Sequence, residues 1–179
     1  MPDPNSRGDT EALIDHVMPL IDASGGGAFL LMTSHRAVQA AARHLRGDRR
    51  YTLFVQGEDD RARLVRRFAE TDNGILVGAA SFWEGVDVPG RALRLVLIDK
   101  LPFAAPDDPV FEARLNAIRI SGGRPFPDYQ LPQAIIGLRQ GVGRLIRGEE
   151  DRGLLILGDP RLRSHGYGAQ ILRALPDMP

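Results

Sequence analysis

Residues 28–35 read Ala-Phe-Leu-Leu-Met-Thr-Ser-His, and this stretch decides the fold class that the sequence predicts. The five apolar residues Ala28–Met32 follow one another without alternation, which is typical of a strand buried on both faces of a parallel sheet. Short runs rich in Leu, Ile and Val recur and predict four further strands at Tyr51–Val55, Ile75–Gly78, Leu93–Ile98 and Leu154–Leu157. Helices expected between the strands imply parallel pairing, so we predict an α/β fold, a three-layer α/β/α sandwich with a mostly parallel sheet.

Apolar residues at helical spacing predict the helices that flank this sheet. They are expected over about Thr10–Ala23, His35–Arg46, Asp59–Glu70, Asp108–Ser121 and Gln133–Arg147. Residues 1–9 lack such a pattern and are expected to form a flexible start, so that the domain covers residues 10–179. Residues 101–132 form an insertion that holds six of the thirteen prolines. An insertion of this length is either functional, for example as a docking surface, or a structural excursion.

The composition excludes several classes of function. The 179 residues include no cysteine, which removes disulfides, thiolate metal sites and thiol catalysis. Neither a membrane-spanning apolar run nor a signal peptide is recognisable, so a cytoplasmic location is expected by default. The formal net charge is zero, which gives no overall attraction to nucleic acid. Any such contact must use local patches, of which residues 36–67, with nine arginines against four acids, are one candidate.

The helix expected over Gln133–Arg147 carries the most informative motif, since residues 140–147 read Gln-Gly-Val-Gly-Arg-Leu-Ile-Arg. At roughly 100° per residue, one face collects a core-facing stripe of Ile135, Leu138, Val142, Leu145 and Ile146. Spacings of three, four and seven residues bring together on the opposite face Gln133, Gln140, Arg144 and Arg147. Two guanidiniums and two amides suit an anion with several oxygens, such as the terminal phosphate of a nucleotide.

Three glycines distinguish this interpretation from that of an ordinary amphipathic helix with a solvated face. Gly137, Gly141 and Gly143 each cost roughly 1 kcal/mol of helix propensity relative to Ala. A face that is merely solvated has no use for them. We therefore interpret the glycines as room for the close approach of a ligand.

In an open parallel sheet, ligands collect beyond the carboxyl ends of the strands. Those ends hold Thr33-Ser34-His35, Gln56-Gly57-Glu58, residues 80–87 and Asp99-Lys100-Leu101-Pro102. At the first end, two hydroxyls and exposed helix amides suit a phosphate, although plain capping of the helix explains them equally well. The acids that follow Gly57 also begin a helix, where they complement its dipole.

Residues 81–90 read Ser-Phe-Trp-Glu-Gly-Val-Asp-Val-Pro-Gly and resist such a simple explanation. Glu84 and Asp87 flank Gly85 at a strand end and suit a ribose hydroxyl or a pairing arginine. Metal binding has no support, because no histidine neighbours them. The sequence holds no Gly-x-x-x-x-Gly-Lys-Ser/Thr phosphate loop, so Asp99 is not interpreted as a magnesium ligand. The sequence thus has arginines suited to phosphoryl transfer but no phosphate loop to bind the triphosphate. This combination indicates half of an ATPase site.

Four motifs together resemble those of superfamily 2 helicases of the DinG/XPD branch. Residues 140–147 match the Gln-x-x-Gly-Arg-x-x-Arg signature of motif VI, and residues 81–87 resemble the Ser-x-Trp-Glu-Gly-Val-Asp of motif V. Residues 100–103 are similar to the branch's Lys-Leu-Pro-Phe segment, and Thr33-Ser34-His35 resembles motif IV. The likeness runs in the same order along nearly the whole chain from about residue 10. It implies a RecA-like domain that lacks its own P-loop, the second of two such domains.

The resemblance also implies cofactors and partners. Two RecA-like domains would clamp ATP and Mg²⁺ between them while single-stranded DNA crosses both. The phosphate loop, the Mg²⁺-binding acids and an iron–sulfur cluster would belong to a first motor domain, expected upstream in a longer protein. The 179-residue chain alone is then expected to hydrolyse no ATP. Work in bacterial DNA repair or replication, near the nucleoid and with 5′-to-3′ movement, is what the family implies.

Site residues are carried over from the resemblance by position. Arg144 and Arg147 resemble the arginines that reach across the cleft to the γ-phosphate, and Gln140 resembles the glutamine that orients the phosphate or the attacking water. Residues on the nucleotide side would be Asp87, Glu84, Gly85 and Gly143. Residues on the DNA side would be Thr33, Ser34, His35, Gln56, Gly57 and Ser81.

Two other functions stay open on the sequence. One is a non-enzymatic RecA-like module that binds nucleic acid or a partner protein, and a phosphate loop encoded upstream would argue against it. The other is a small-molecule enzyme of doubly wound fold that uses Arg144 and Arg147 on an anionic metabolite.

Overall fold

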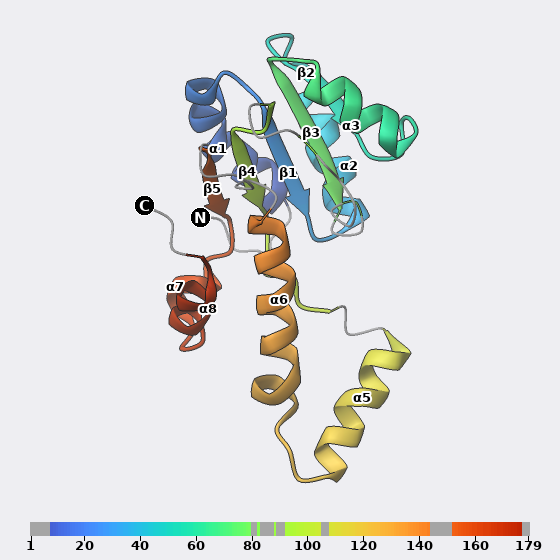
Figure 1. The fold of residues 1–179 in the computed structure, drawn as a ribbon, viewed down its shortest axis with the longest axis vertical. Helices are drawn as coiled ribbons and strands as arrows, with labels where there is room; N and C mark the ends of the chain where they lie inside the picture. The colour runs from blue at the N-terminus through green and yellow to red at the C-terminus, as the bar shows by residue number, and fades with distance from the viewer. Residues whose placement is uncertain are drawn as a thin grey trace.

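The computed structural model describes residues 8–79, 82, 88, 92–104, 108–143 and 152–176. Five strands form one sheet in the order β2-β3-β1-β4-β5, and every neighbouring pair is parallel. The strands are β1 Ala28–Met32, β2 Thr52–Val55, β3 Gly74–Ala79, β4 Leu95–Ile98 and β5 Leu154–Leu157 (Figure 1). The prediction of a parallel α/β fold is therefore confirmed, and the predicted bounds of β1 and β5 are those observed.

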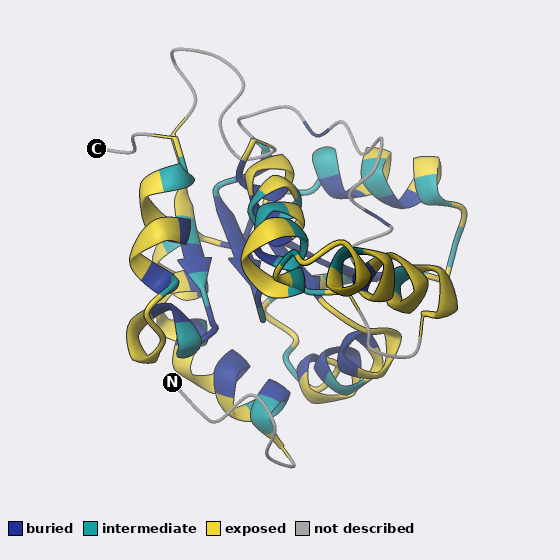
Figure 2. Cartoon of the chain, turned by 90° about the horizontal axis from the view of Figure 1, so that it is seen from below, coloured by how far each residue is buried: buried dark blue, intermediate teal, exposed yellow. Residues whose placement is uncertain are grey.

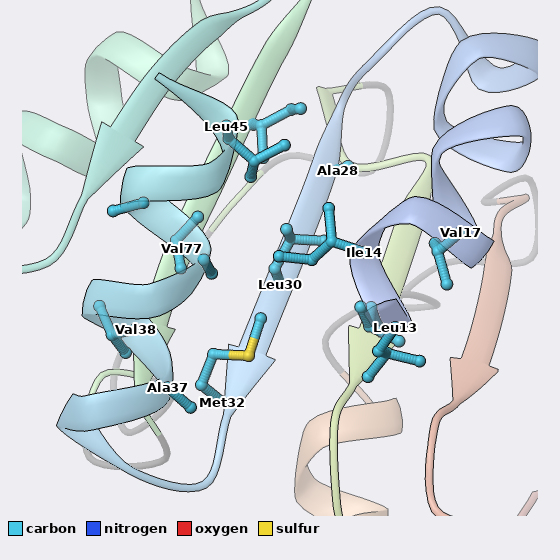
Figure 3. Close-up of a cluster of buried hydrophobic side chains, with 14 of the residues drawn as sticks. Leu13, Ile14, Val17, Ala28, Leu30, Met32, Ala37, Val38, Leu45 and Val77 are labelled. Carbon is cyan, nitrogen blue, oxygen red and sulfur yellow. The ribbon is translucent and has the colours of Figure 1, made fainter. Parts of the chain in front are cut away.

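Helices cover both faces of the sheet. One face packs against α1, Asp9–Ser24, and α2, His35–Leu45, and the other against α3, Arg61–Ala69, and the C-terminal helices. Alternate residues of β1 serve the two cores, because successive side chains of a strand point to opposite faces. Figure 3 shows the first core, where side chains of α1 and α2 meet Ala28, Leu30 and Met32. In Figure 2 the dark blue strands lie between the helical layers.

Residues 101–132 leave the sheet and return to it. They include α5, Pro109–Ile120, and a π-helical turn, η2, Phe126–Gln130, which leads into α6, Leu131–Val142. The α5 helix was predicted, but only Leu115 of its residues is buried, and Figure 1 shows α5 standing away from the sheet. The α6 helix begins two residues before the predicted start, because η2 already sets its direction. Residues 144–147 of the predicted helix lie outside the described residues.

Two short helices complete the described chain: α7, Arg161–Ser164, and α8, Gly168–Ala174. The sequence reasoning missed both. Within the described part of the chain, no helix has the length and the apolar character that crossing a membrane requires.

The strand register brings the candidate loops to one edge. Met32 of β1 pairs with Ala79 of β3, and Leu31 pairs with Ile98 of β4. Ile98 in turn pairs with Leu157 of β5. The residues that follow these strands, among them Thr33 and Asp99, therefore lie along the same carboxyl edge. We call this the carboxyl edge of the sheet below.

Candidate functional site

Asp99 ties two strand ends together at the carboxyl edge. It follows β4, is 2% exposed, and accepts hydrogen bonds through Oδ1 from the backbone amides of Thr33, at 2.8 Å, and Lys100, at 2.7 Å. Its Oδ2 lies 3.3 Å from the hydroxyl of Thr33. Burial raises the pKa of Asp99 to about 6, although these hydrogen bonds favour the charged form. The carboxyl group thus fixes the loop after β1 rather than facing a ligand.

The three residues proposed for the DNA side after β1 are exposed and begin α2. Ser34 is the N-cap, and its hydroxyl accepts a hydrogen bond from the amide of Ala37 at 3.2 Å. The capping explanation is therefore confirmed for Ser34. Thr33 has its amide and hydroxyl engaged by Asp99, whereas the ring of His35 is exposed at the first position of the helix. The three residues lie together, but two of them have their polar side chains occupied.

Gln56 and Gly57, after β2, also lie at this edge. The side-chain oxygen of Gln56 accepts a hydrogen bond from the amide of Ala79 at 2.7 Å, so the amide group of Gln56 joins the end of β2 to that of β3. Gly57 has a φ of +94°, a conformation that favours glycine in this turn. Of the acids that follow, Asp60 caps α3 through the amides of Ala62 and Arg63. The expectation that these acids serve the helix start is confirmed for Asp60.

Arg61 and Phe82 contact each other beyond the end of β3. Arg61, the first residue of α3, donates from Nη2 to the carbonyl oxygen of Phe82 at 3.0 Å, and its guanidinium lies 5.4 Å from the centre of the Phe82 ring. Phe82 is 4% exposed and packs edge-on against Phe29. Its ring fits closely over Gly78, where an added Cβ would lie 3.1 Å from it. Ser81, Trp83, Glu84, Gly85 and Asp87, which are near Phe82 in sequence, lie outside the described residues.

Asp159 holds the next strand end. It follows β5, is 4% exposed, and accepts a hydrogen bond from the amide of Leu101 at 2.8 Å. Arg161 pairs with it at 2.6 Å through Nη2 and stacks its guanidinium over Phe103 at 5.4 Å. Burial alone would raise the pKa of Asp159, but the hydrogen bonds from Arg161 and from backbone amides hold it below its ordinary value. Lys100 forms an ion pair of 2.6 Å with Asp9, and this pair joins the start of α1 to the carboxyl edge of the sheet.

The α6 helix presents the predicted polar face. Gln133 and Gln140 are exposed, whereas Leu138 and Val142 are buried and Ile135 is half-buried. The predicted division of faces is thus confirmed for the described part of the helix. Leu145 and Ile146 of the stripe lie outside the described residues, as do Arg144 and Arg147 of the opposite face.

The interpretation of the three glycines needs correction. A Cβ added to Gly137 would lie 3.3 Å from Cγ of Pro102, so the space at Gly137 accommodates the protein's own Lys-Leu-Pro-Phe segment and not a ligand. Gly141 is buried on the inner side of the helix. Only Gly143, the exposed C-cap of α6, lies on the open side. The ligand interpretation is therefore wrong for Gly137, and Gly141, which is buried, does not lie on the exposed polar face.

The described residues hold no group of three or more His, Asp or Glu side chains that could bind a metal ion. The buried carboxylates of Asp99 and Asp159 are each occupied by amide donors or by an arginine. Sequence reasoning missed the roles of Arg61, Asp159 and Arg161. A signal was present for Asp159 alone, since it is an acid just beyond a predicted strand.

The parallel sheet, its strand order and the helices on both of its faces are those of a RecA-like α/β domain. An XPD helicase of known structure superimposes on the chain with a TM-score of 0.69 at 15% identity, over 99% of this chain and 32% of the other. A second XPD structure, without ligand, gives 0.70 at 15% identity over 97% of this chain and 35% of the other. Identity this low shows the fold alone.

The family follows from sequence. The model of the helicase C-terminal domain matches residues 17–178, and the chain belongs to this family. The chain is 45% identical over 179 residues to the ATP-dependent DNA helicase YoaA of Escherichia coli, covering 100% of this chain and 28% of that protein. It is 38% identical over 175 residues to the ATP-dependent helicase DinG of Mycobacterium tuberculosis, covering 98% and 26%. The chain thus spans little more than a quarter of the length of these two relatives.

Proposed function

We propose that the chain is the second motor domain of an ATP-dependent DNA helicase of the DinG/XPD type. The observation that carries this proposal is the position of α6, whose C-terminal end lies near the carboxyl ends of β1 and β4 (Figure 1). The helix exposes Gln133 and Gln140, and its C-cap Gly143 directly precedes Arg144 in the sequence. A nucleotide held on a first motor domain would meet this face. The helicase names of the similar proteins support the same conclusion.

On the nucleotide side, Arg144 and Arg147 would contact the γ-phosphate and stabilise the charge that develops during transfer. Gln140, exposed one turn before Arg144, would orient the phosphate or the attacking water. Gly143 would allow close approach of the phosphate, and Glu84, Gly85 and Asp87 would contact the ribose or a pairing arginine. Mg²⁺ and any iron–sulfur cluster would be held by other parts of the longer protein.

On the DNA side, the ends of β1, β2 and β3 would follow one strand of DNA through Thr33, Ser34, His35, Gln56, Gly57 and Ser81. The exposed ring of His35 and the first amides of α2 suit a phosphate of the backbone. Asp99, Gln56 and Arg61 would hold these strand ends in fixed positions, because each accepts or donates a hydrogen bond across neighbouring segments.

Turnover of ATP by the full-length protein, with and without single-stranded DNA, tests the proposal. We expect hydrolysis that DNA stimulates, unwinding of a tailed duplex, and no hydrolysis by the 179-residue chain alone. Steady hydrolysis by this chain would refute the assignment of a half-site. A full-length protein that binds DNA without hydrolysing ATP would favour a non-enzymatic module instead.

A further inference from the structure

A cavity of about 470 Å³ opens where β5, α1, α7 and α8 meet, at the edge of the sheet opposite β2. Its apolar lining consists of the side chains of Leu157, Pro160, Leu162 and Leu172. Leu172 is 48% exposed, so the apolar lining extends to the surface of the protein. The volume falls within the range of roughly 300–1,000 Å³ that is usual for binding pockets.

The walls of the cavity are held in place before any ligand arrives. Asp159 fixes the turn into α7 through the amide and guanidinium of Arg161. The start of α8 packs directly on α7, because a Cβ added to Gly168 would lie 1.9 Å from the carbonyl oxygen of Leu162. Because the cavity is preformed, binding of a ligand does not lose free energy in ordering the cavity walls.

The lining of the cavity includes one arginine, Arg163, and one histidine, His16. Residues 152–176 contain four arginines and one acid, in a protein whose formal net charge is zero. That acid, Asp159, is already paired with Arg161. Arg163 and His16 line the cavity and are exposed, and neither forms an ion pair within the described ranges. Among the described residues that line the cavity, Arg163 is therefore a cation that no carboxylate offsets, since Asp159 is paired with Arg161.

We propose that this cavity docks an acidic peptide segment of a partner protein. One bulky apolar side chain of the peptide enters the aliphatic lining, and flanking carboxylates pair with Arg163 and contact His16. Nucleic acid fits less well, because bases stack on aromatic rings and the described lining includes no Phe, Tyr or Trp side chain. The cavity also lies beyond β5, whereas the proposed DNA side lies at the ends of β1, β2 and β3.

Fluorescence anisotropy on the full-length protein tests the proposal with labelled synthetic peptides in which glutamates flank Leu, Ile or Phe. We expect saturable binding that Arg163→Glu weakens about tenfold or more, as facing like charges do. Leu172→Asp should weaken it to a similar degree. Arg66→Glu is the matched control, because Arg66 is exposed on α3 at the other side of the domain and should leave binding unchanged.

Each other outcome overturns the proposal. Equal binding of a peptide that has glycine in place of its apolar residue would indicate charge attraction alone. Displacement of the peptide by a single-stranded oligonucleotide would assign the surface to nucleic acid. If light scattering shows that Arg163→Glu lowers the mass of the free protein, the occupant of the cavity would be a second copy of the chain. Binding by no peptide of the set, or equal effects of Arg163→Glu and Arg66→Glu, would refute the site.

Discussion

Asp99 accepts a hydrogen bond from the backbone amide of Thr33 at 2.8 Å, across 66 positions of sequence. The bond joins the end of β4 to the end of β1, the strand that leads into the proposed DNA side. Asp99 also receives the amide of Lys100, which begins the segment that packs against α6. A single buried carboxyl group thus connects the proposed DNA side of the domain with the helix that leads to Arg144.

Replacing Asp99 tests this connection. Asp99→Ala leaves two backbone amides without their acceptor, and unsatisfied buried groups cost about 1–3 kcal/mol each. Asp99→Asn keeps an oxygen for both amides and should be far less destabilising. Urea unfolding at pH 7.5 measures the difference. Equal losses in the two variants would show that the negative charge, and not the acceptor, holds the strand ends.

The stability of the protein should depend on pH through the same group. The pKa of Asp99 is about 6 in the folded protein against an ordinary value of 3.8, so the folded state keeps a proton that the unfolded chain has lost. The contribution of Asp99 to the free energy of unfolding therefore falls as the pH rises from about 4 to about 6. Asp99→Asn should flatten this part of the profile, which unfolding in urea at several pH values measures. An unchanged slope in the variant would assign the pH dependence to other groups.

Arg61 should position the segment after β3 for coupling between DNA and ATP. Arg61→Ala removes the hydrogen bond to the carbonyl of Phe82 and the contact with its ring, at a cost of about 1 kcal/mol in stability. We expect the stimulation of ATP turnover by DNA to fall more than the turnover without DNA. Arg61→Lys keeps the charge but lacks the planar fork, and should recover the stimulation only in part.

A matched control for Arg61 lies on the same helix. Arg66 is exposed, and no ion pair or ring contact involves it within the described chain, so Arg66→Ala should leave turnover and stability unchanged. If Arg61→Ala lowers the melting temperature but leaves the stimulation by DNA intact, the role of Arg61 is structural only.

The Asp159–Arg161 pair should matter more for stability than an ordinary surface ion pair. Asp159 is 4% exposed, so Arg161→Ala leaves a buried carboxylate without its cation, a change that costs about 3 kcal/mol or more. The double change Asp159→Asn with Arg161→Met removes both charges and should recover part of the loss. Denaturant unfolding measures both variants. If Arg161→Ala lowers the free energy of unfolding by less than about 1 kcal/mol, the pair contributes no more than an exposed ion pair does.

The sequence predicts a helix or strand of this structure only where the apolar pattern of that element is long enough to be recognised. The runs Ala28–Met32 and Leu154–Leu157 predict their strands at the observed bounds, because each is apolar throughout and flanked by polar residues or glycine. The α7 and α8 helices have 4 and 7 residues, too few for a helical period to appear. Gly137 was misinterpreted because the residue that fills its space, Pro102, is distant in sequence.

The candidate site shows the same limit. Thr33 and Asp99 were both expected at carboxyl ends of strands, but their contact requires β1 and β4 to be neighbours. Strand order depends on which apolar faces pack best in three dimensions, and no local pattern carries it. The pair of Arg61 with Phe82 likewise joins a helix start to a strand end and leaves no trace in residue spacing.

Arg147→Ala, and to a similar degree Arg144→Ala, should abolish ATP turnover by the full-length protein while binding of single-stranded DNA survives. An arginine that reaches the γ-phosphate from a second domain contributes roughly 10³–10⁵ in rate, because its charge stabilises the transition state. Arg139→Ala is the matched control, since Arg139 is an exposed arginine of α6 that precedes the motif. Steady-state hydrolysis and anisotropy with a labelled oligonucleotide separate the two activities. Equal loss of hydrolysis and of DNA binding would mean that these arginines contact DNA or maintain the fold, and the proposed nucleotide side would then have to lie elsewhere on the domain.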